Sequence, residues 1–259
     1  MNKYLINYYL YSRIMKSNSG RNRYKIKLNK GWYRAIALLY YPFLFFRRWR
    51  DNMKISVINQ SAIKINSGDK VIYFDPYNIK EESHNADYIF ITHDHYDHYD
   101  EASIEKIKKD TTKIIVPLCL KDKEHNLLIE GYRYYGIDDI KFVTVPSYNI
   151  DKQFHPREKY YVGYVIELEG KNLYIMGDTD RTLESDNVKC DICFVPIGGT
   201  YTMNVDEASD YINYIHPEVA IPIHYGSIVG DKSLGEEFKS KVDDNIRVEV
   251  LMGEKEYDC

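Results

Sequence analysis

The sequence predicts an α/β fold in which two packed β-sheets are covered on the outside by a few helices. Two observations on the chain from residue 53 onward favour this class. Short runs rich in β-branched and aromatic residues recur between Gly, Asp, Asn and Pro, which is typical of strands. Helix-like stretches are few and fall mostly late in the chain. Many strands with a few helices form layers, because each sheet must bury one face against another element.

The predicted elements follow from these patterns. Expected strands span residues 55–65, 70–74, 88–91, 113–116, 141–145, 162–168, 171–176, 190–195, 219–223 and 247–251. Expected helices span residues 101–109, 206–215 and 234–241. Asp206 is the expected N-cap of the second helix, and Pro217 should end that helix after His216. Hairpin turns are expected at residues 67–69 and 169–172.

The distribution of charge divides the chain in two. Residues 1–52 hold 12 Lys and Arg against one acid, Asp51, which leaves 23 basic and 38 acidic residues in 53–259. We therefore expect a basic, aromatic extension at 1–52 and one acidic domain at 53–259. A basic arm suits a polyanionic partner, either a membrane surface or nucleic acid. The acidic domain argues against a large nucleic-acid footprint, because phosphate contacts need clustered Lys and Arg.

The extension contains an apolar run at residues 35–46, flanked by aromatic and basic residues. The run is shorter than the roughly 20 residues that a membrane-spanning helix needs, and Pro42 interrupts it. Three interpretations stay open: an interfacial segment at a membrane surface, an ordinary docking helix, or a segment outside the native protein. The chain shows no signal peptide, so a cytoplasmic location with free thiols is expected, with peripheral membrane contact as a further prediction.

The sequence places two cysteines at a redox-motif spacing, Cys190 and Cys193. They run into the predicted strand 190–195, whose alternation would send the two side chains to opposite faces. We therefore expect a structural role for both.

A dense group of metal-binding side chains follows the predicted strand 88–91. It contains His93, His95, Asp97 and His98 within six residues. Imidazole and carboxylate are the ligands that zinc favours, and they also suit iron and manganese. A loop leaving a strand can turn the first two histidines to one point and the other two residues to a second point nearby. The spacing therefore predicts a site for two metal ions.

This His-x-His-x-Asp-His pattern resembles the signature of the metallo-β-lactamase superfamily. The likeness extends to Asp178, at the place of the family's metal-bridging aspartate, and to His224, at the place of its last histidine ligand. Residues 75–77 and 195–203 are also similar, the latter to a subgroup related to ascorbate-6-phosphate lactonase and to the phospholipase D acting on N-acyl phosphatidylethanolamine. The resemblance implies a four-layer αββα sandwich over 53–259.

One departure concerns the third histidine that the family supplies to its first metal. The predicted strand 141–145 is followed by Asn149 where that histidine is expected, and His155 lies six residues further on. We favour His155 as the ligand, because imidazole binds these metals better than a neutral amide. Asn149 stays as the alternative.

The resemblance implies hydrolysis by a metal-bound hydroxide, formed because metal lowers the pKa of water to about 7. Asp97 and Asp178 are the expected catalytic carboxylates, and two Zn²⁺ ions are the expected cofactor, with Mn²⁺ or Fe²⁺ as alternatives. A phosphodiester, a lactone or another ester is the expected substrate, as a small molecule or a lipid. Phospholipid cleavage at a membrane and metal binding without turnover are the alternative functions. Tyr201 and Tyr225 are candidate substrate contacts.

Overall fold

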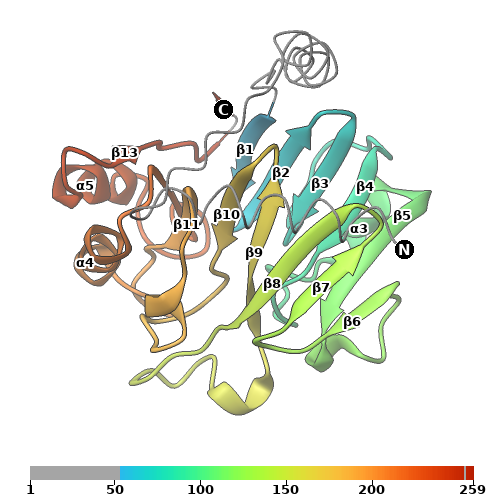
Figure 1. Cartoon of the computed structure of the whole chain (residues 1–259), viewed down its shortest axis with the longest axis horizontal. Helices are drawn as coiled ribbons and strands as arrows, with labels where there is room; N and C mark the ends of the chain where they lie inside the picture. The colour runs from blue at the N-terminus through green and yellow to red at the C-terminus, as the bar shows by residue number, and fades with distance from the viewer. Residues whose placement is uncertain (1–52, 254) are drawn as a thin grey trace, which may run out of the picture. The chain divides into compact units, whose positions relative to one another are not determined.

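The computed structural model describes residues 53–253 and 255–259, which form two seven-stranded sheets packed face to face (Figure 1). The expected extension at 1–52 lies outside the described residues. The first sheet has the order β14-β1-β2-β3-β4-β5-β6 and the second has the order β13-β12-β11-β10-β9-β8-β7. Each sheet is antiparallel in one half and parallel in the other.

The strand bounds of the first sheet are β1 Met53–Asn59, β2 Ala62–Ser67, β3 Lys70–Phe74, β4 Ala86–Phe90, β5 Lys108–Pro117, β6 Leu127–Ile129 and β14 Glu256–Asp258. Those of the second sheet are β7 Tyr134–Ile137, β8 Ile140–Pro146, β9 Val162–Leu168, β10 Lys171–Ile175, β11 Ile192–Pro196, β12 Val219–Ile223 and β13 Arg247–Val248. The α-helices are α3 Glu101–Ile107, α4 Val205–Ile215 and α5 Leu234–Lys241. Short 3₁₀ turns lie at Leu118–Leu120, Arg157–Lys159 and Ser185–Asn187.

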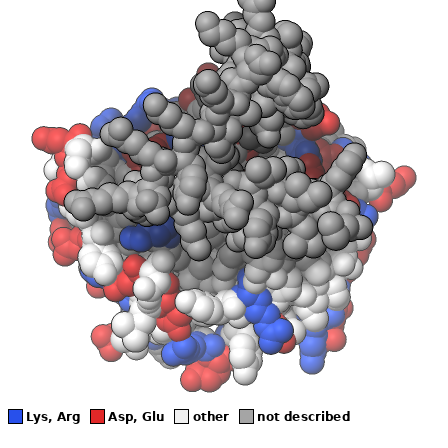
Figure 2. All heavy atoms as spheres, in the orientation of Figure 1, with Lys and Arg blue, Asp and Glu red and all other residues white. Residues whose placement is uncertain are grey.

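The expected αββα layer order is confirmed. Helix α3 buries Ile104 and Ile107 against the outer face of the first sheet. Helices α4 and α5 cover the outer face of the second sheet, where Tyr211 and Phe238 enter the same apolar cluster. Acidic and basic side chains of the described residues are interspersed over the face shown in Figure 2.

Several predicted boundaries need correction. The strand expected at 55–65 is two strands, because Gln60 takes a positive φ of 52° and turns the chain between β1 and β2. The first helix ends at Ile107 rather than at residue 109, since strand β5 begins at Lys108. Strands β6, β7 and β14 were not anticipated, because they are short or interrupted by polar residues.

The N-cap of helix α4 is Asn204 and not the expected Asp206. The Asn204 side chain accepts a hydrogen bond from the Glu207 backbone N–H, and the Glu207 carboxylate accepts one from the Asn204 N–H, both at 2.9 Å. This reciprocal capping box satisfies two N–H groups that the helix leaves free. The helix ends at Ile215, as expected, and its C-cap His216 takes a left-handed φ of 55° directly before Pro217. The expected hairpin turns after β2 and β9 are also confirmed.

The position of Cys190 also differs from the prediction. Cys190 precedes β11 instead of lying in it, so strand alternation does not separate it from Cys193. Burial raises the pKa of the Cys193 thiol, and a hydrogen bond to Cys190 adds to that rise. Both thiols are free.

Within the described residues no helix is long and apolar enough to cross a bilayer.

Four aromatic side chains form the centre of the core between the sheets. The Phe90 ring stacks on Phe74 with centroids 5.0 Å apart, and it meets Phe142 and Tyr164 edge to face at 5.2 Å. Edge-to-face pairs are favourable because the electron-poor ring edge meets the electron-rich ring face. These contacts join β3 and β4 of one sheet to β8 and β9 of the other, so the cluster fixes how the sheets pack.

We expect Phe142→Ala to lower the free energy of unfolding by about 3–5 kcal/mol, because the ring is buried and the sheets cannot close the cavity left behind. The neighbouring Val143 is a matched control, since its side chain points to the opposite face and is 37% exposed. Val143→Ala should change stability by about 1 kcal/mol or less. Urea unfolding followed by circular dichroism measures both, and equal losses would contradict this assignment of the core.

Candidate metal centre

The site lies where the carboxyl ends of parallel strands from both sheets come together. Residues 92–98 follow β4, and Asp75 follows the neighbouring strand β3. On the second sheet, Asp178 comes shortly after β10 and His224 directly follows β12. Parallel strands place their carboxyl ends at one edge of a sheet, so segments distant in sequence meet there.

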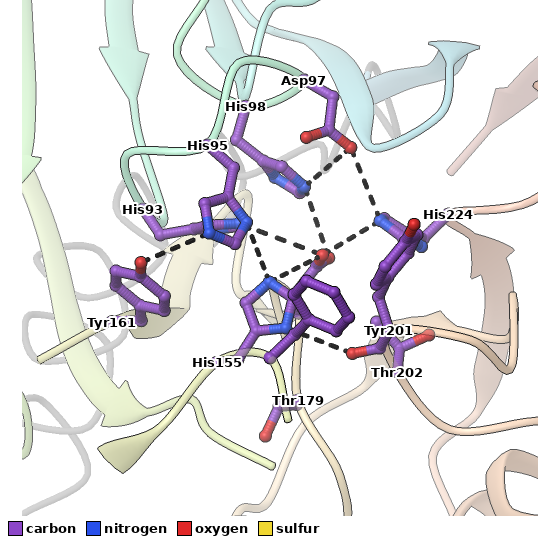
Figure 3. A network of polar contacts seen from close by, with 12 residues as sticks. His93, His95, Asp97, His98, His155, Tyr161, Thr179, Tyr201, Thr202 and His224 are labelled. Carbon is purple, nitrogen blue, oxygen red and sulfur yellow. Dashed lines mark hydrogen bonds and ion pairs between the residues drawn. The ribbon is translucent and has the colours of Figure 1, made fainter. Parts of the chain in front are cut away.

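The structure brings all seven predicted ligand residues to one place (Figure 3). Their nitrogen and carboxylate oxygen atoms form three overlapping groups, each with members within 4.8 Å of one another. The groups are His93, His95 and His155; His93, His98 and Asp178; and Asp97, His98 and His224.

The carboxylate of Asp178 lies between these groups and is 3% exposed. Its Oδ2 is 3.0 Å from His224 Nε2 and 3.3 Å from His155 Nε2. Its Oδ1 is 3.4 Å from His98 Nε2. One carboxylate therefore faces histidines of two different groups, which is the geometry that a ligand shared by two cations requires.

The geometry favours His155 over Asn149 as the partner of His93 and His95. His155 Nε2 lies 3.1 Å from His95 Nδ1, and the two rings face the same point. The Asn149 amide nitrogen instead donates to the main-chain carbonyls of Phe154 at 2.9 Å and Tyr201 at 2.7 Å. Residues 150–154 form a loop that returns the chain, and His155 takes a positive φ of 57° there.

The donor set fits bound cations. His93 Nε2, His98 Nε2 and Asp178 Oδ1 are buried and make no hydrogen bond, since the 3.4 Å approach of the last two lacks hydrogen-bond geometry. A buried polar atom left in this way costs roughly 1–3 kcal/mol, so proteins rarely keep several together without a reason. Cations held among these atoms would satisfy all three, and imidazole with carboxylate suits zinc, iron or manganese.

Hydrogen bonds from outside the cluster orient four of the five histidines. Each bond uses the ring nitrogen that faces away from the cluster, which fixes the tautomer and directs the other nitrogen inward. The bonds are Thr92 Oγ1 with His93 Nδ1 at 2.9 Å, Tyr161 Oη with His95 Nε2 at 3.5 Å, Asp75 Oδ2 with His98 Nδ1 at 2.8 Å, and the Tyr201 carbonyl with His155 Nδ1 at 3.2 Å.

Asp75 is the residue that sequence reasoning underrated. It is fully buried and accepts hydrogen bonds from Thr92 N and Thr92 Oγ1, both at 2.7 Å, in addition to the one from His98. Burial raises the pKa of Asp75, while the nearby His98 opposes that rise. The sequence signal for Asp75 is its place between the end of a hydrophobic strand and Pro76.

Two further residues of the site were not predicted from the sequence. Tyr161 meets His95, and burial together with a hydrogen bond to Asp94 raises the pKa of its hydroxyl. Gln60, in the turn between β1 and β2, donates to Asp97 Oδ2 at 3.5 Å, and its carbonyl accepts from the His224 N–H at 2.9 Å. No motif marks either residue, because each acts through a contact with a distant segment.

The charges in the cluster shift one another's protonation. Burial lowers the pKa of His93, and repulsion from His98 lowers it further. Burial opposes protonation of His224, but the adjacent Asp178 outweighs it and raises the pKa of His224 to about 9. Burial would also raise the pKa of Asp178, yet His224 and His98 hold it well below its usual range. Protons and cations thus compete for the same atoms.

A cavity of about 390 Å³ opens directly on the cluster. Of the two candidate substrate contacts, Tyr201 lines this cavity, whereas Tyr225 is buried in the apolar cluster beneath α4 and α5 and does not. A larger hollow of about 860 Å³ adjoins it and shares Asp94 and Tyr96 with it. The smaller cavity is the relevant one for chemistry, because only it is lined by members of the histidine and aspartate cluster.

Comparison with known proteins identifies the class. A profile of the β-lactamase superfamily domain matches residues 54–224. A UPF0173 metal-dependent hydrolase of Staphylococcus aureus is 30% identical over 214 residues, which cover 73% of this chain and 93% of the relative. A solved structure from Parabacteroides distasonis, described as a candidate metal-dependent hydrolase, is 28% identical, with a TM-score of 0.68 and coverage of 78% of this chain and 93% of that one. Igni18, a metallo hydrolase of Ignicoccus hospitalis, shares the fold at 22% identity, with a TM-score of 0.67 and coverage of 80% and 97%.

The αββα fold and the histidine and aspartate cluster at its strand ends define a metallo-β-lactamase-type protein with a candidate metal centre. The chain belongs to the metallo-β-lactamase superfamily, and the UPF0173 metal-dependent hydrolases are among its relatives. The narrower likeness to the subgroup of ascorbate-6-phosphate lactonase stays a prediction.

We expect Asp75→Asn to weaken zinc binding by about 10–100-fold, because an amide cannot accept all three hydrogen bonds that orient His98 and Thr92. Competition against a chromogenic chelator measures the affinity. Asp69→Asn, in an exposed turn on the same hairpin, is the control and should bind zinc like the unaltered protein. Equal affinities for the two variants would exclude Asp75 from orienting the ligands.

Proposed function

We propose that this protein is a metal-dependent hydrolase whose cofactor is held by the cluster around Asp178 and whose substrate is a phosphodiester or a lactone or other ester. The observation that carries the proposal is the buried Asp178 carboxylate, which faces two groups of histidines whose inward nitrogens include atoms without a partner. The cavity that opens on these residues gives a substrate access to them.

The residues divide between two ions. His93, His95 and His155 would hold one ion, and Asp97, His98 and His224 would hold the other. Asp178 would contribute to both. Zinc suits this set best among the expected metals, and manganese or iron accepts the same donors.

Bound metal supplies two kinds of chemistry, a lowered pKa for water and a positive charge that polarises the scissile group. The chain supplies the rest. Asp97 lines the cavity, and its Oδ2 lies 3.6 Å from both His98 Nε2 and His224 Nε2. Burial opposes ionisation of Asp97, but a hydrogen bond with His224 and the charge of His98 lower its pKa. An ionised Asp97 can orient the attacking water and accept its proton.

The arrangement supports hydrolysis over metal binding without turnover. The alternative function drew on the absence of a histidine at Asn149, yet His155 takes the corresponding place beside His93 and His95. A purely structural metal site is normally closed by protein ligands. Here the cavity reaches His95, Asp97, His155, Asp178 and His224.

We expect the full chain to bind zinc or manganese and to hydrolyse an ester or phosphodiester from a panel of p-nitrophenyl substrates. His95→Ala should lower kcat/KM by at least about 100-fold, because it removes a ligand that faces the cavity. His155→Ala should reduce the bound metal measured by atomic emission spectroscopy, whereas Asn149→Ala should retain more of it.

His125→Ala is the matched control, because this partly buried histidine lies outside the cavity lining and is hydrogen-bonded to the Lys123 carbonyl. It should leave metal content and kcat/KM unchanged. Turnover that survives both chelation and His95→Ala would exclude the proposal.

The basic extension motivates a second proposal, that residues 1–52 hold the domain at an anionic membrane surface and present it with lipid substrates. The proposal is supported by the charge of this segment, which has 12 basic residues and a single acid. Polybasic segments gain roughly 1 kcal/mol per Lys or Arg near anionic lipid.

We expect the full chain, but not residues 53–259, to sediment with vesicles that contain phosphatidylserine, and salt should weaken the binding because it screens the charges. Vesicles of phosphatidylcholine alone are the control. Equal sedimentation of the two proteins would remove the extension from any role at a membrane.

A further inference from the structure

One wall of the cavity over the metal centre is apolar. Phe154, Tyr201 and Ile228 line it, and they come from three separate loops. The Phe154 and Tyr201 rings meet nearly at right angles, with centroids 4.7 Å apart. Phe154 is 44% exposed and lines the cavity, so part of its ring is open to a ligand.

Hydrogen bonds connect this wall to His155, the proposed metal ligand. The Tyr201 carbonyl accepts from the Asn149 amide at 2.7 Å and from His155 Nδ1 at 3.2 Å. The same Asn149 amide donates to the Phe154 carbonyl at 2.9 Å. Asn149 thus joins both aromatic residues to the histidine, so a group bound on the wall has a fixed position relative to the metal centre.

The side chains of the cavity offer a phosphate ester no positive charge beyond the imidazoles and the cations that the proposed function places in the cluster. Besides Tyr96 and Tyr201, its ionisable side chains are three carboxylates and the imidazoles of the cluster, and among residues 53–253 no Lys or Arg lines it. Sites that recognise phosphate usually place Arg or Lys against the non-bridging oxygens. Asp94, at the rim, adds negative charge that repels an anion.

We propose that the substrate is an uncharged carboxylic ester or lactone whose aliphatic or aryl group rests on Phe154, Tyr201 and Ile228. This inference builds on the proposed hydrolase function and selects one of its two substrate classes. Water oxygen bonds to the carbonyl carbon and the bond to the leaving alkoxide breaks. The proton released by water passes through Asp97 to that alkoxide, so the products are a carboxylic acid and an alcohol and no oxidant is needed.

The first test compares p-nitrophenyl acetate, butyrate and hexanoate on the metal-loaded full chain. We expect kcat/KM to rise about fourfold for each added methylene that the wall buries, which corresponds to about 0.8 kcal/mol. The rate enhancement, which is kcat/KM divided by the rate constant of the uncatalysed reaction, should be smaller for bis-p-nitrophenyl phosphate than for p-nitrophenyl butyrate. A flat chain-length series, or a preference for the phosphate, would overturn the inference.

The second test alters the wall. Phe154→Ala should flatten the chain-length series through a rise in KM for the longer esters and should retain bound metal. Leu183→Ala, an 81% exposed leucine outside the cavity lining, should keep the series steep. A series that stays steep in Phe154→Ala shows that the apolar group binds elsewhere and contradicts the inference.

The third test measures binding without turnover. 2-Octanone is a neutral carbonyl compound that cannot be hydrolysed, and its binding to chelator-treated protein can be followed by saturation-transfer NMR. We expect binding that Phe154→Ala weakens, and no such binding would overturn the inference even if esters were cleaved. Metal-dependent cleavage of phosphate alone would refute the inference and keep the hydrolase, whereas ketone binding without any metal-dependent turnover would refute the hydrolase.

Discussion

The structure depends on one buried negative charge, the carboxylate of Asp178. Its oxygen atoms lie between 3.0 and 3.9 Å from ring nitrogens of four histidines. A carboxylate removed from water is strongly destabilised unless positive charge or hydrogen-bond donors surround it. The histidines provide this only in part, because His93 Nε2 and His98 Nε2 themselves lack partners. Cations bound in the cluster would balance this charge, and the surrounding hydrogen bonds already orient the histidines toward the positions that such cations would take.

The two mixed sheets explain how ligands from distant segments reach one point. Phe74 pairs with Phe90, so Asp75 and the chain before Thr92 leave the first sheet side by side. Pro196 pairs with Ile223, so His224 leaves the second sheet beside the segment after β11. The aromatic core between the sheets fixes their relative position, and thereby the distance between the two halves of the site.

The layer order and the segment 93–98 could be predicted from local signals in the sequence, whereas Asp178, His224 and His155 were expected only because the chain resembles the metallo-β-lactamase superfamily. Hydrophobic runs mark the strands, and His93 to His98 lie in one short segment whose spacing is distinctive. Gln60, Asp75 and Tyr161 could not be assigned in this way, since each contributes through a contact with a remote part of the chain. The strand break at Gln60 was missed for a related reason, because a single residue at positive φ leaves the hydrophobic pattern on both sides unchanged.

The loop that carries His155 has a thermodynamic consequence. A ligand placed on a strand is held by the sheet whatever occupies the cavity, but His155 is held through Asn149 and the Tyr201 carbonyl, which also shape the cavity wall. Occupation of the wall and occupation of the metal position therefore depend on the same hydrogen-bonded loop. Linkage makes such coupling reciprocal. A compound that orders the wall increases the affinity of the site for the cation, and the cation increases the affinity for the compound by the same factor.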